Sequence, residues 1–364
     1  MKVLHVNAGA ETGGGKTHIL SLLSQLPMNE VELAVFEEGE ISKEARELGI
    51  TVHVFKQASR YDLSVLRRLT AFINDNQYDI VHTHGARANF FVALLKSRIH
   101  AKWVTTIHSD PLLDFMKRGF KGWLFTKLNL RALKKVDLFF AITERFKKNL
   151  VSLGLPAGKI KVIYNGIYYT QEPATPYDKQ EDLHIPADSF TVIQVARLHP
   201  VKGHEILLDA LQKVNIPNLK VLLVGDGPSE QQLKDIVKER ELTDTVLFLG
   251  FRRDTDRLYA TANISLLTSY SESFPLVLLE SANQRVPFIA TDVGDMHKLL
   301  PNSSYGWVIK AGDSDALAAA LEEAYLTRHE LAVMGEHMYQ YASSRFSLEK
   351  LSRDTYESYE SLLR

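Results

Sequence analysis

The first strand and loop of the chain decide its fold class. Residues 1–6 read Met1-Lys2-Val3-Leu4-His5-Val6, and residues 10–17 read Ala10-Glu11-Thr12-Gly13-Gly14-Gly15-Lys16-Thr17. The first run is typical of a buried strand, and a helical pattern over Ile19–Leu26 follows the glycines. A strand, a glycine-rich turn and a helix in this order predict a βαβ unit whose helix N-terminus can face an anion.

Apolar runs alternate with amphipathic stretches along the rest of the chain. In the first half, further strands are expected at Val31–Phe36, Thr51–Phe55, Ile80–Thr83, Trp103–Ile107 and Leu138–Ile142, with helical patterns at Leu63–Ile73 and Phe90–Ile99. Residues 168–189 are polar, contain three prolines and are interpreted as a linker. The alternation then restarts, with strands expected at Thr191–Ala196, Lys220–Val224, Val246–Leu249, Ile264–Leu267 and Phe288–Ala290, and helices at Asp313–Tyr325 and Leu348–Leu363.

This alternation predicts an α/β protein with two doubly wound parallel-sheet domains facing across a cleft. The chain has 364 residues, more than a single core normally supports, which also favours two domains. Cysteine is absent, which excludes a disulfide framework, a thiolate metal site and a cysteine nucleophile. The sequence shows no secretory signal pattern and no run of 18 apolar residues, so we expect a cytoplasmic protein whose membrane contact is at most peripheral.

The net charge of −1 hides an asymmetry between the two halves. Residues 1–170 carry 24 Lys or Arg and 15 Asp or Glu, giving 24 − 15 = +9, whereas residues 171–364 carry 19 and 29, giving 19 − 29 = −10. Within the first half, residues 115–136 hold seven cations and no acid among aromatic and aliphatic side chains. This segment suits an amphipathic helix on anionic lipid. The alternative is a helix packed in the domain with its lysines in water; no nucleic-acid module accompanies it, so nucleic acid is not expected as a partner.

The glycine-rich turn supports two functional interpretations. It nearly spells a P-loop, with Ala10 where the first glycine belongs, and a P-loop NTPase would place Lys16 on phosphate. The run that offers a Walker-B aspartate, Leu222–Asp226, falls in the other predicted domain. We therefore favour an anion-facing turn, and keep an NTPase as an alternative.

Histidines stand at the carboxyl ends of two apolar runs. His82 and His84 end one run, and His108 follows the next. Metal sites usually need a helical pair of ligands or nearby carboxylates, so we expect no metal here. The residues are either hydrogen-bonded core histidines or part of a polar pocket.

Two motifs in the second half carry the strongest chemical signal. Arg197 and Lys202 lie five residues apart in the loop after a strand, a compact cationic pair suited to a diphosphate. Further on, Glu272 precedes a predicted helix in whose first turn Pro275 is expected, and Glu280 falls about two turns into it among apolar residues. The alternatives are two solvated cations and a glutamate on the solvent face of the helix. The two Asp-x-Asp sequences, at residues 254–256 and 313–315, are interpreted as helix caps rather than as metal ligands.

Together these motifs resemble those of the family-4 retaining glycosyltransferases of GT-B fold, over nearly the whole chain. The most specific match is the pair Glu272 and Glu280, separated by seven residues with Phe-Pro between them. The remaining matches are Gly13-Gly14 with His18, the Asp79–His82 strand end, His108, Asn165-Gly166, Arg197 with Lys202-Gly203, Val224–Pro228 and Leu249–Phe251. One departure concerns the segment after the glutamate helix, where the family often has Gly-Gly-x-x-Glu and this chain has Gly294-Asp295-Met296-His297-Lys298.

The resemblance implies a role for each matching residue. Arg197 and Lys202 would hold the donor diphosphate, Glu272 would grip the donor sugar, and His108 would lie near its anomeric carbon. The implied donor-binding residues are Gly14, Gly227, Phe251, Arg252, Phe274, Pro275, Leu276 and Glu280, and the implied acceptor-side residues are His18, His82 and His84. The implied domains are residues 1–168, joined by a returning helix at about 348–364, and residues 185–347.

The expected activity is transfer of a sugar, with retention, from a nucleotide diphosphate sugar to an acceptor hydroxyl. A UDP-sugar is favoured as donor and a glycan or lipid-linked molecule of bacterial surface-polysaccharide synthesis as acceptor. No metal or other cofactor is expected, because fixed cations and helix N–H groups can stabilise the leaving diphosphate. A nucleotide-sugar epimerase of the same fold is the second alternative.

Overall fold

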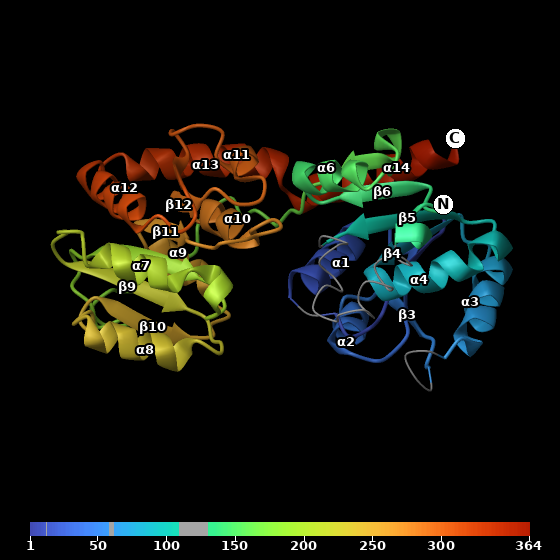
Figure 1. Ribbon diagram of the computed structural model, residues 1–364, viewed down its shortest axis with the longest axis horizontal. Coiled ribbons are helices and arrows are strands. Elements are labelled where there is room, and N and C mark those ends of the chain that lie inside the picture. Colours follow the sequence, from blue (N-terminus) through green and yellow to red (C-terminus); the bar gives the residue numbers. More distant parts are fainter. Residues whose placement is uncertain (12, 58–61, 109–129) are drawn as a thin grey trace. The chain divides into compact units, whose positions relative to one another are not determined.

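The computed structural model describes residues 1–11, 13–57, 62–108 and 130–364. The described chain divides into two compact units. Unit 1 comprises Met1–Gly166 and Leu348–Arg364, and unit 2 comprises Ile167–Ser347. Each is a doubly wound α/β unit built on a parallel sheet (Figure 1).

In the described part of unit 1, seven parallel strands form one sheet in the order β3-β2-β1-β4-β5-β6-β7. The strands are β1 (Val3–Asn7), β2 (Val31–Val35), β3 (Thr51–Val54), β4 (Ile80–His84), β5 (Lys102–Ile107), β6 (Leu138–Ala141) and β7 (Ile160–Val162). The helices are α1 (Gly14–Gln25), α2 (Glu40–Glu47), α3 (Ser64–Asp75), α4 (Ala86–Leu95), α6 (Glu144–Ser152) and α14 (Leu348–Leu363), with short 3-10 turns η1 (Lys96–Arg98) and η3 (Ala157–Lys159).

Unit 2 contains six parallel strands in the order β10-β9-β8-β11-β12-β13. The strands are β8 (Phe190–Val195), β9 (Leu219–Val224), β10 (Val246–Gly250), β11 (Ile264–Leu267), β12 (Phe288–Thr291) and β13 (Gly306–Ile309). The helices are η4 (Pro200–Lys202), α7 (His204–Leu211), α8 (Glu230–Glu239), α9 (Thr255–Thr261), α10 (Leu276–Asn283), α11 (Met296–Leu299), α12 (Ser314–Leu326) and α13 (Leu331–Arg345).

The C-terminal helix α14 belongs to unit 1, as the family resemblance implies. It packs against α1, and its buried Leu351 and Tyr359 join the core beneath that helix. Tyr356, at the margin of the same core, donates its hydroxyl to Glu30 at 3.0 Å. Figure 1 shows this red helix beside the green helix α6, which comes from the first half of the chain.

The segment interpreted as a linker is packed onto unit 2 along its length. Leu183 and Ile185 are buried in the core around Tyr259. Backbone N–H groups of this segment donate hydrogen bonds to side chains of unit 2; for example, Tyr177 N donates to the Thr261 hydroxyl at 2.8 Å. Partners from the unit take the place of regular secondary-structure hydrogen bonds, so the segment is part of unit 2 rather than a free connection.

Each sheet reverses its strand order once. In unit 1 the reversal lies between β1 and β4, and in unit 2 between β8 and β11. The loops that leave the two strands at such a point run in opposite directions and open a crevice at the carboxyl edge, where ligands of α/β sheets bind. Both points therefore mark where chemistry is expected.

Candidate functional site

The loop after β8 is fixed against the segment that follows β11. Gly203 has a φ of 66°, and a Cβ on it would lie 2.1 Å from the carbonyl oxygen of Thr268. The Thr268 hydroxyl donates to the carbonyl of Lys202 at 2.9 Å, and the Gln194 amide donates to it at 3.2 Å. Only glycine permits this approach, which holds Lys202 at the switch point of unit 2.

The Lys202 ammonium forms an ion pair with Glu272 across the switch point. Its Nζ lies 2.6 Å from Glu272 Oε1, and the Ser269 hydroxyl donates to the same oxygen at 2.6 Å. The Glu272 side chain is 12% exposed, so the contact is largely shielded from water. A cation that follows β8 thus meets a carboxylate that follows the neighbouring strand β11.

Arg197 lies on the same edge, in a loop that packs against the loop after β9. A Cβ on Gly225 would lie 2.1 Å from the Ala196 carbonyl oxygen, and one on Gly227 would lie 2.3 Å from that of Leu198. The two glycines, with φ of 138° and 154°, therefore have a packing role beneath Arg197. The Arg197 side chain is exposed and has no ion-pair partner among the described residues.

Glu280 lies inside α10, in an apolar setting. Burial raises the pKa of its carboxyl, and no hydrogen bond or ion pair to another described residue satisfies it. The buried Tyr259 hydroxyl also has no partner, and its pKa is raised well above its usual range by burial and by the charge of Glu280. An unpartnered acid of this kind can accept hydrogen bonds from hydroxyl groups of a ligand.

The start of α10 differs by one residue from the prediction. Pro275 has a ψ of 98° and precedes the helix, which begins at Leu276. Proline cannot donate a hydrogen bond, so it suits this cap position as well as the first turn. Phe274 is buried and packs on Phe346 at 5.5 Å between ring centroids, which anchors the approach to the helix.

Phe251 and Arg252, the two predicted donor-binding residues after β10, differ in how far other side chains hold them. Phe251 is 66% exposed, whereas Arg252 is held by Asp254 at 2.6 and 2.8 Å and by the Tyr177 hydroxyl at 2.9 Å. The Asp254 carboxylate therefore binds Arg252 and does not cap α9 through its side chain, contrary to the prediction. Asp313 does cap its helix, accepting from Ala316 N at 2.9 Å.

The segment that departs from the family pattern borders Glu272. A Cβ on Gly294, which has a φ of 65°, would lie 3.2 Å from the Glu272 carbonyl oxygen. Asp295 directly precedes the short helix α11, and Lys298 in that helix is exposed. The change of charge thus falls one loop away from the Lys202–Glu272 pair.

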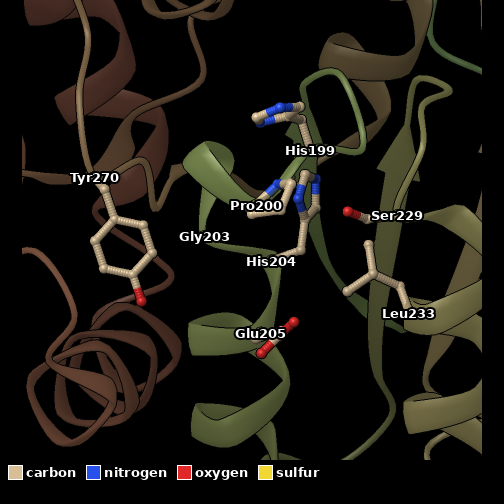
Figure 2. Close-up of a pocket in the computed structure, with 8 residues that line it drawn as sticks. All are labelled: His199, Pro200, Gly203, His204, Glu205, Ser229, Leu233 and Tyr270. Atoms are coloured by element: carbon tan, nitrogen blue, oxygen red, sulfur yellow. The ribbon is translucent and has the colours of Figure 1, made fainter. Parts of the chain in front are cut away.

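A small pocket adjoins the Lys202 loop on the α7 and α8 side. It has a volume of about 220 Å³ and is lined by His199, Pro200, Gly203, His204, Glu205, Ser229, Leu233 and Tyr270 (Figure 2). His204 is buried, its Nε2 has no partner, and burial and the charge of Lys202 lower its pKa to about 4. Its imidazole is therefore neutral at physiological pH.

In unit 1 the glycine turn opens α1 at the switch point. A Cβ on Gly14 would meet no atom within 4 Å, so its own unit leaves the space beside this backbone open. Lys16 points elsewhere: its Nζ lies 2.6 Å from Glu44 Oε1 and 3.0 Å from Glu40 Oε2, both on α2. Two carboxylates already neutralise the lysine that a P-loop would place on phosphate, which counts against the NTPase alternative.

The histidines of β1, β4 and the β5 end form one hydrogen-bonded cluster. His84 Nε2 lies 3.0 Å from His5 Nδ1, and His84 Nδ1 lies 3.3 Å from His108 Nε2. His82 bonds to the Tyr359 hydroxyl of α14 through Nδ1 and to Thr106 through Nε2. His82 and His84, both predicted as site residues, thus belong to a hydrogen-bond network that also contains His5 and Tyr359.

Burial keeps this cluster uncharged. It lowers the pKa of His5 to about 3 and that of His18 to about 4. The pKa values of His82, His84 and His108 are also well below the usual value, because of burial and then of the neighbouring imidazoles. His5, His82 and His84 lie close enough to hold a metal ion, but their ring nitrogens are already bonded within the network, as expected of core histidines.

His18 on α1 lies beside this cluster and has a free acceptor. Its Nδ1 donates to Asn165 Oδ1 at 2.7 Å, and its buried Nε2 has no hydrogen-bond partner among the residues that the structure describes. The ring packs edge-on against His108, with 4.7 Å between centroids. The predicted residues His18, His82, His84 and His108 are therefore neighbours. No local pattern pointed to Tyr359, which lies 277 positions from His82.

The basic segment extends largely beyond the described chain. Residues 115–129, with Lys117, Arg118, Lys121 and Lys127, are outside it, and of the remainder Lys135 donates to the Ala93 carbonyl at 2.9 Å. Among the helices that the structure describes, none has the length and apolar character needed to cross a bilayer.

Comparison with known proteins decides the family. The model for glycosyl transferases group 1 matches residues 178–341, and the model for glycosyltransferase family 4 matches residues 12–170. The chain belongs to the group 1 glycosyltransferases. The P-loop NTPase alternative is thereby set aside, and the protein is an enzyme of the glycosyltransferase class.

Two curated relatives and one solved structure illustrate the breadth of this glycosyltransferase family. The N-acetyl-alpha-D-glucosaminyl L-malate synthase of Bacillus anthracis is 28% identical over 323 residues, covering 83% of this chain and 80% of that protein. The O-antigen chain mannosyltransferase C of Escherichia coli is 29% identical over 343 residues, covering 89% of each. The Anabaena protein HepE in complex with UDP superposes with a TM-score of 0.88 at 22% identity, covering 99% of this chain and 100% of that one. This likeness confirms the GT-B fold.

Proposed function

We propose that this glycosyltransferase moves a sugar, with retention, from a nucleotide diphosphate sugar to an acceptor hydroxyl. The observation that carries the proposal is the Lys202–Glu272 pair at the switch point of unit 2. Arg197 and Glu280 accompany it on loops and helices of the same sheet edge. Two cations and two carboxylates match the charges and hydroxyl groups of such a donor.

Each group has a distinct part in this proposal. When the sugar–phosphate bond breaks, negative charge develops on the diphosphate, and Arg197 and Lys202 stabilise it. A phosphate then competes with Glu272 for the Lys202 ammonium, which leaves the Glu272 carboxylate free to accept from sugar hydroxyls. Glu280 accepts from the ribose hydroxyls. The leaving phosphate takes the proton of the acceptor hydroxyl as that oxygen attacks the same face of the sugar.

Several observations favour a UDP-sugar and a surface-polysaccharide acceptor. HepE was also determined with UDP-glucose, and a pneumococcal O-GlcNAc transferase of similar fold was determined with UDP and GlcNAc. Among the curated relatives are O-antigen and lipopolysaccharide core glycosyltransferases. We infer a UDP-sugar donor and a glycan or lipid-linked acceptor on this basis.

A nucleotide panel tests the donor. Thermal unfolding is measured with UDP, GDP, ADP and their sugars, with EDTA present, because the proposed chemistry requires no metal. A ligand at 100 times its Kd adds about 2.7 kcal/mol of stability. We expect UDP and a UDP-sugar to raise the midpoint, and no response to any nucleotide would contradict the proposal.

Lys202→Ala tests the transfer step. We expect transfer to fall by at least about 100-fold, the usual loss when one fixed group that stabilises transition-state charge is removed. Lys213→Ala is the matched control, because Lys213 pairs with Asp315 at 2.6 Å beyond the far end of α7. Wild-type rates in Lys202→Ala would refute the assignment, and sugar release with one ring centre inverted would indicate an epimerase instead.

We also propose, on the sequence alone, that residues 115–136 hold the enzyme peripherally on the anionic inner face of a bacterial membrane. Neutralising Lys117, Arg118, Lys121 and Lys127 should then reduce co-sedimentation with anionic vesicles. Unchanged binding would remove this part of the proposal and leave the donor assignment intact.

A further inference from the structure

A continuous chain of hydrogen-bonding groups runs through the unit 1 switch point. It starts at His108, whose side chain is partly exposed, and continues through His84 and His5, which are 1% and 0% exposed. It then passes to Tyr359 and returns to His82 and Thr106. Each inner member uses both of its polar positions on its neighbours, so the chain has one partly exposed end.

Proton counting allows only two arrangements of this chain. A neutral imidazole has one N–H and one bare nitrogen, and a tyrosine hydroxyl donates once. Once the Tyr359 proton is assigned to one of its two histidine contacts, every other link must follow in the same direction. The proton therefore lies on Nε2 of all four histidines, or on Nδ1 of all four.

The contacts of Tyr359 select the first arrangement. Its hydroxyl oxygen lies 2.5 Å from His82 Nδ1 and 3.5 Å from His5 Nε2. A separation of 2.5 Å is shorter than the roughly 2.7–3.2 Å of an N–H···O bond, so we assign the single hydroxyl proton to this contact rather than to the longer one. Tyr359 therefore donates to His82 Nδ1, and its oxygen accepts from His5 Nε2.

The order then propagates to the partly exposed end. His5 Nδ1 accepts from His84 Nε2, and His84 Nδ1 accepts from His108 Nε2. His108 is left with a bare Nδ1. His18, whose Nδ1 donates to Asn165, contributes a second bare nitrogen, its buried Nε2.

We propose that Tyr359 is a positioning residue that fixes His108 in the Nε2–H tautomer, so that His108 Nδ1 and His18 Nε2 together accept hydrogen bonds from hydroxyl groups of a carbohydrate. Two neutral acceptors repel phosphate oxygens and attract sugar hydroxyls. The C-terminal helix thereby acts on unit 1 chemistry through side chains that never touch the ligand. The role of the carbohydrate rests on the proposed function, whereas the tautomer order does not.

Nuclear magnetic resonance of the full chain with ¹⁵N-labelled histidine tests the order directly. Long-range proton–nitrogen correlations distinguish the two tautomers of each ring. We expect Nε2–H on His5, His82, His84 and His108, and Nδ1–H on His18. An Nδ1–H proton on His108 in the wild-type protein would overturn the proposal without any variant and without any substrate.

Tyr359→Phe removes the hydroxyl that sets the direction. We expect His108 to populate both tautomers in this variant. We also expect kcat for transfer to fall about tenfold while KM for the donor changes less than twofold, because the lost hydrogen bond acts on the transfer step more than on donor binding. Tyr356→Phe is the matched control on the same helix, since it removes only the bond to Glu30, and should change neither quantity.

The two readouts separate the possible failures. An unchanged His108 tautomer in folded Tyr359→Phe would overturn the positioning role. The expected tautomer order in a protein that transfers no sugar would refute the proposed function and leave the order of the chain standing. If Tyr359→Phe does not fold, the wild-type spectrum alone decides.

Discussion

Lys16 and Lys202 each follow a strand end at the switch point of a sheet, yet their partners give them different roles. Lys16 is neutralised by two carboxylates of α2, whereas Lys202 meets one carboxylate that is itself a candidate ligand group. The same contrast separates Arg252, tied to Asp254, from the exposed Arg197. At the scale of residues, a cation that is exposed or meets a single carboxylate is more available to a ligand than one already held by two carboxylates or by a bidentate one.

Glu280→Gln should separate stability from binding. The pKa of Glu280 is raised in the folded state, so the unfolded chain loses this proton first as pH rises, and the wild-type protein is destabilised from about pH 4.5 upward. Removing the charge should therefore raise the unfolding midpoint of the ligand-free protein at pH 8. It should also weaken UDP binding by about tenfold or more, the value of a charged hydrogen bond.

Calorimetric titration with UDP and thermal scans at pH 5 and pH 8 measure both effects of Glu280→Gln. Glu323→Gln is the control, because Glu323 lies on the exposed side of α12. A variant that binds UDP as tightly as the wild-type protein would contradict the role of Glu280.

At the scale of elements, the long apolar strands and the last helix agree with the predictions to within a residue or two. α14 was expected at Leu348–Leu363 and occupies those residues. β7 and β13 were not predicted, since β7 has only three residues with Lys161 between two apolar side chains, and β13 has only four residues and begins with a glycine. Short edge strands are specified by the neighbour that pairs with them, which no local pattern records.

Glycines at the ends of strands and helices likewise depend on residues that are distant in sequence. Gly203, Gly225 and Gly227 were noted as parts of motifs, but the reason for each is a carbonyl oxygen from a distant loop at about the position of a Cβ. The close approach brings the loops after β8, β9 and β11 to one edge. The elements therefore place Arg197 and Lys202 through backbone packing rather than through contacts of their own side chains.

At the scale of the whole molecule, the buried histidines of unit 1 make the free energy of unfolding depend on pH. His5, His18, His82, His84 and His108 have lowered pKa values in the folded state, so unfolding takes up protons as pH falls below about 6.5. Stability is complete above that pH and is lost on acidification, by about 1.4 kcal/mol per pH unit for each proton taken up. We expect the slope of the unfolding free energy against pH, between pH 6 and pH 5, to correspond to the uptake of several protons on unfolding.

Urea unfolding at pH 7, 6 and 5 measures this slope. His18→Gln should reduce it by about one proton, whereas His297→Gln, which removes a side chain that is 75% exposed, should leave it unchanged. A stability that does not change between pH 7 and pH 5 would show that the histidines are not buried as neutral rings.

The sequence by itself determined the fold class, the two units and the family resemblance, because periodicity and motif spacing are local and survive without coordinates; the return of the last helix was implied by that resemblance. It also singled out Arg197, Lys202, Glu272, Glu280 and the prominent histidines. Only the tertiary structure decided that Lys16 is neutralised, that Arg252 is tied to Asp254, that residues 168–189 pack on unit 2, and that Tyr359 closes a chain of histidines. Those outcomes depend on which partners the fold brings together from distant positions, and hydrogen bonding and charge neutralisation are properties of pairs rather than of single residues.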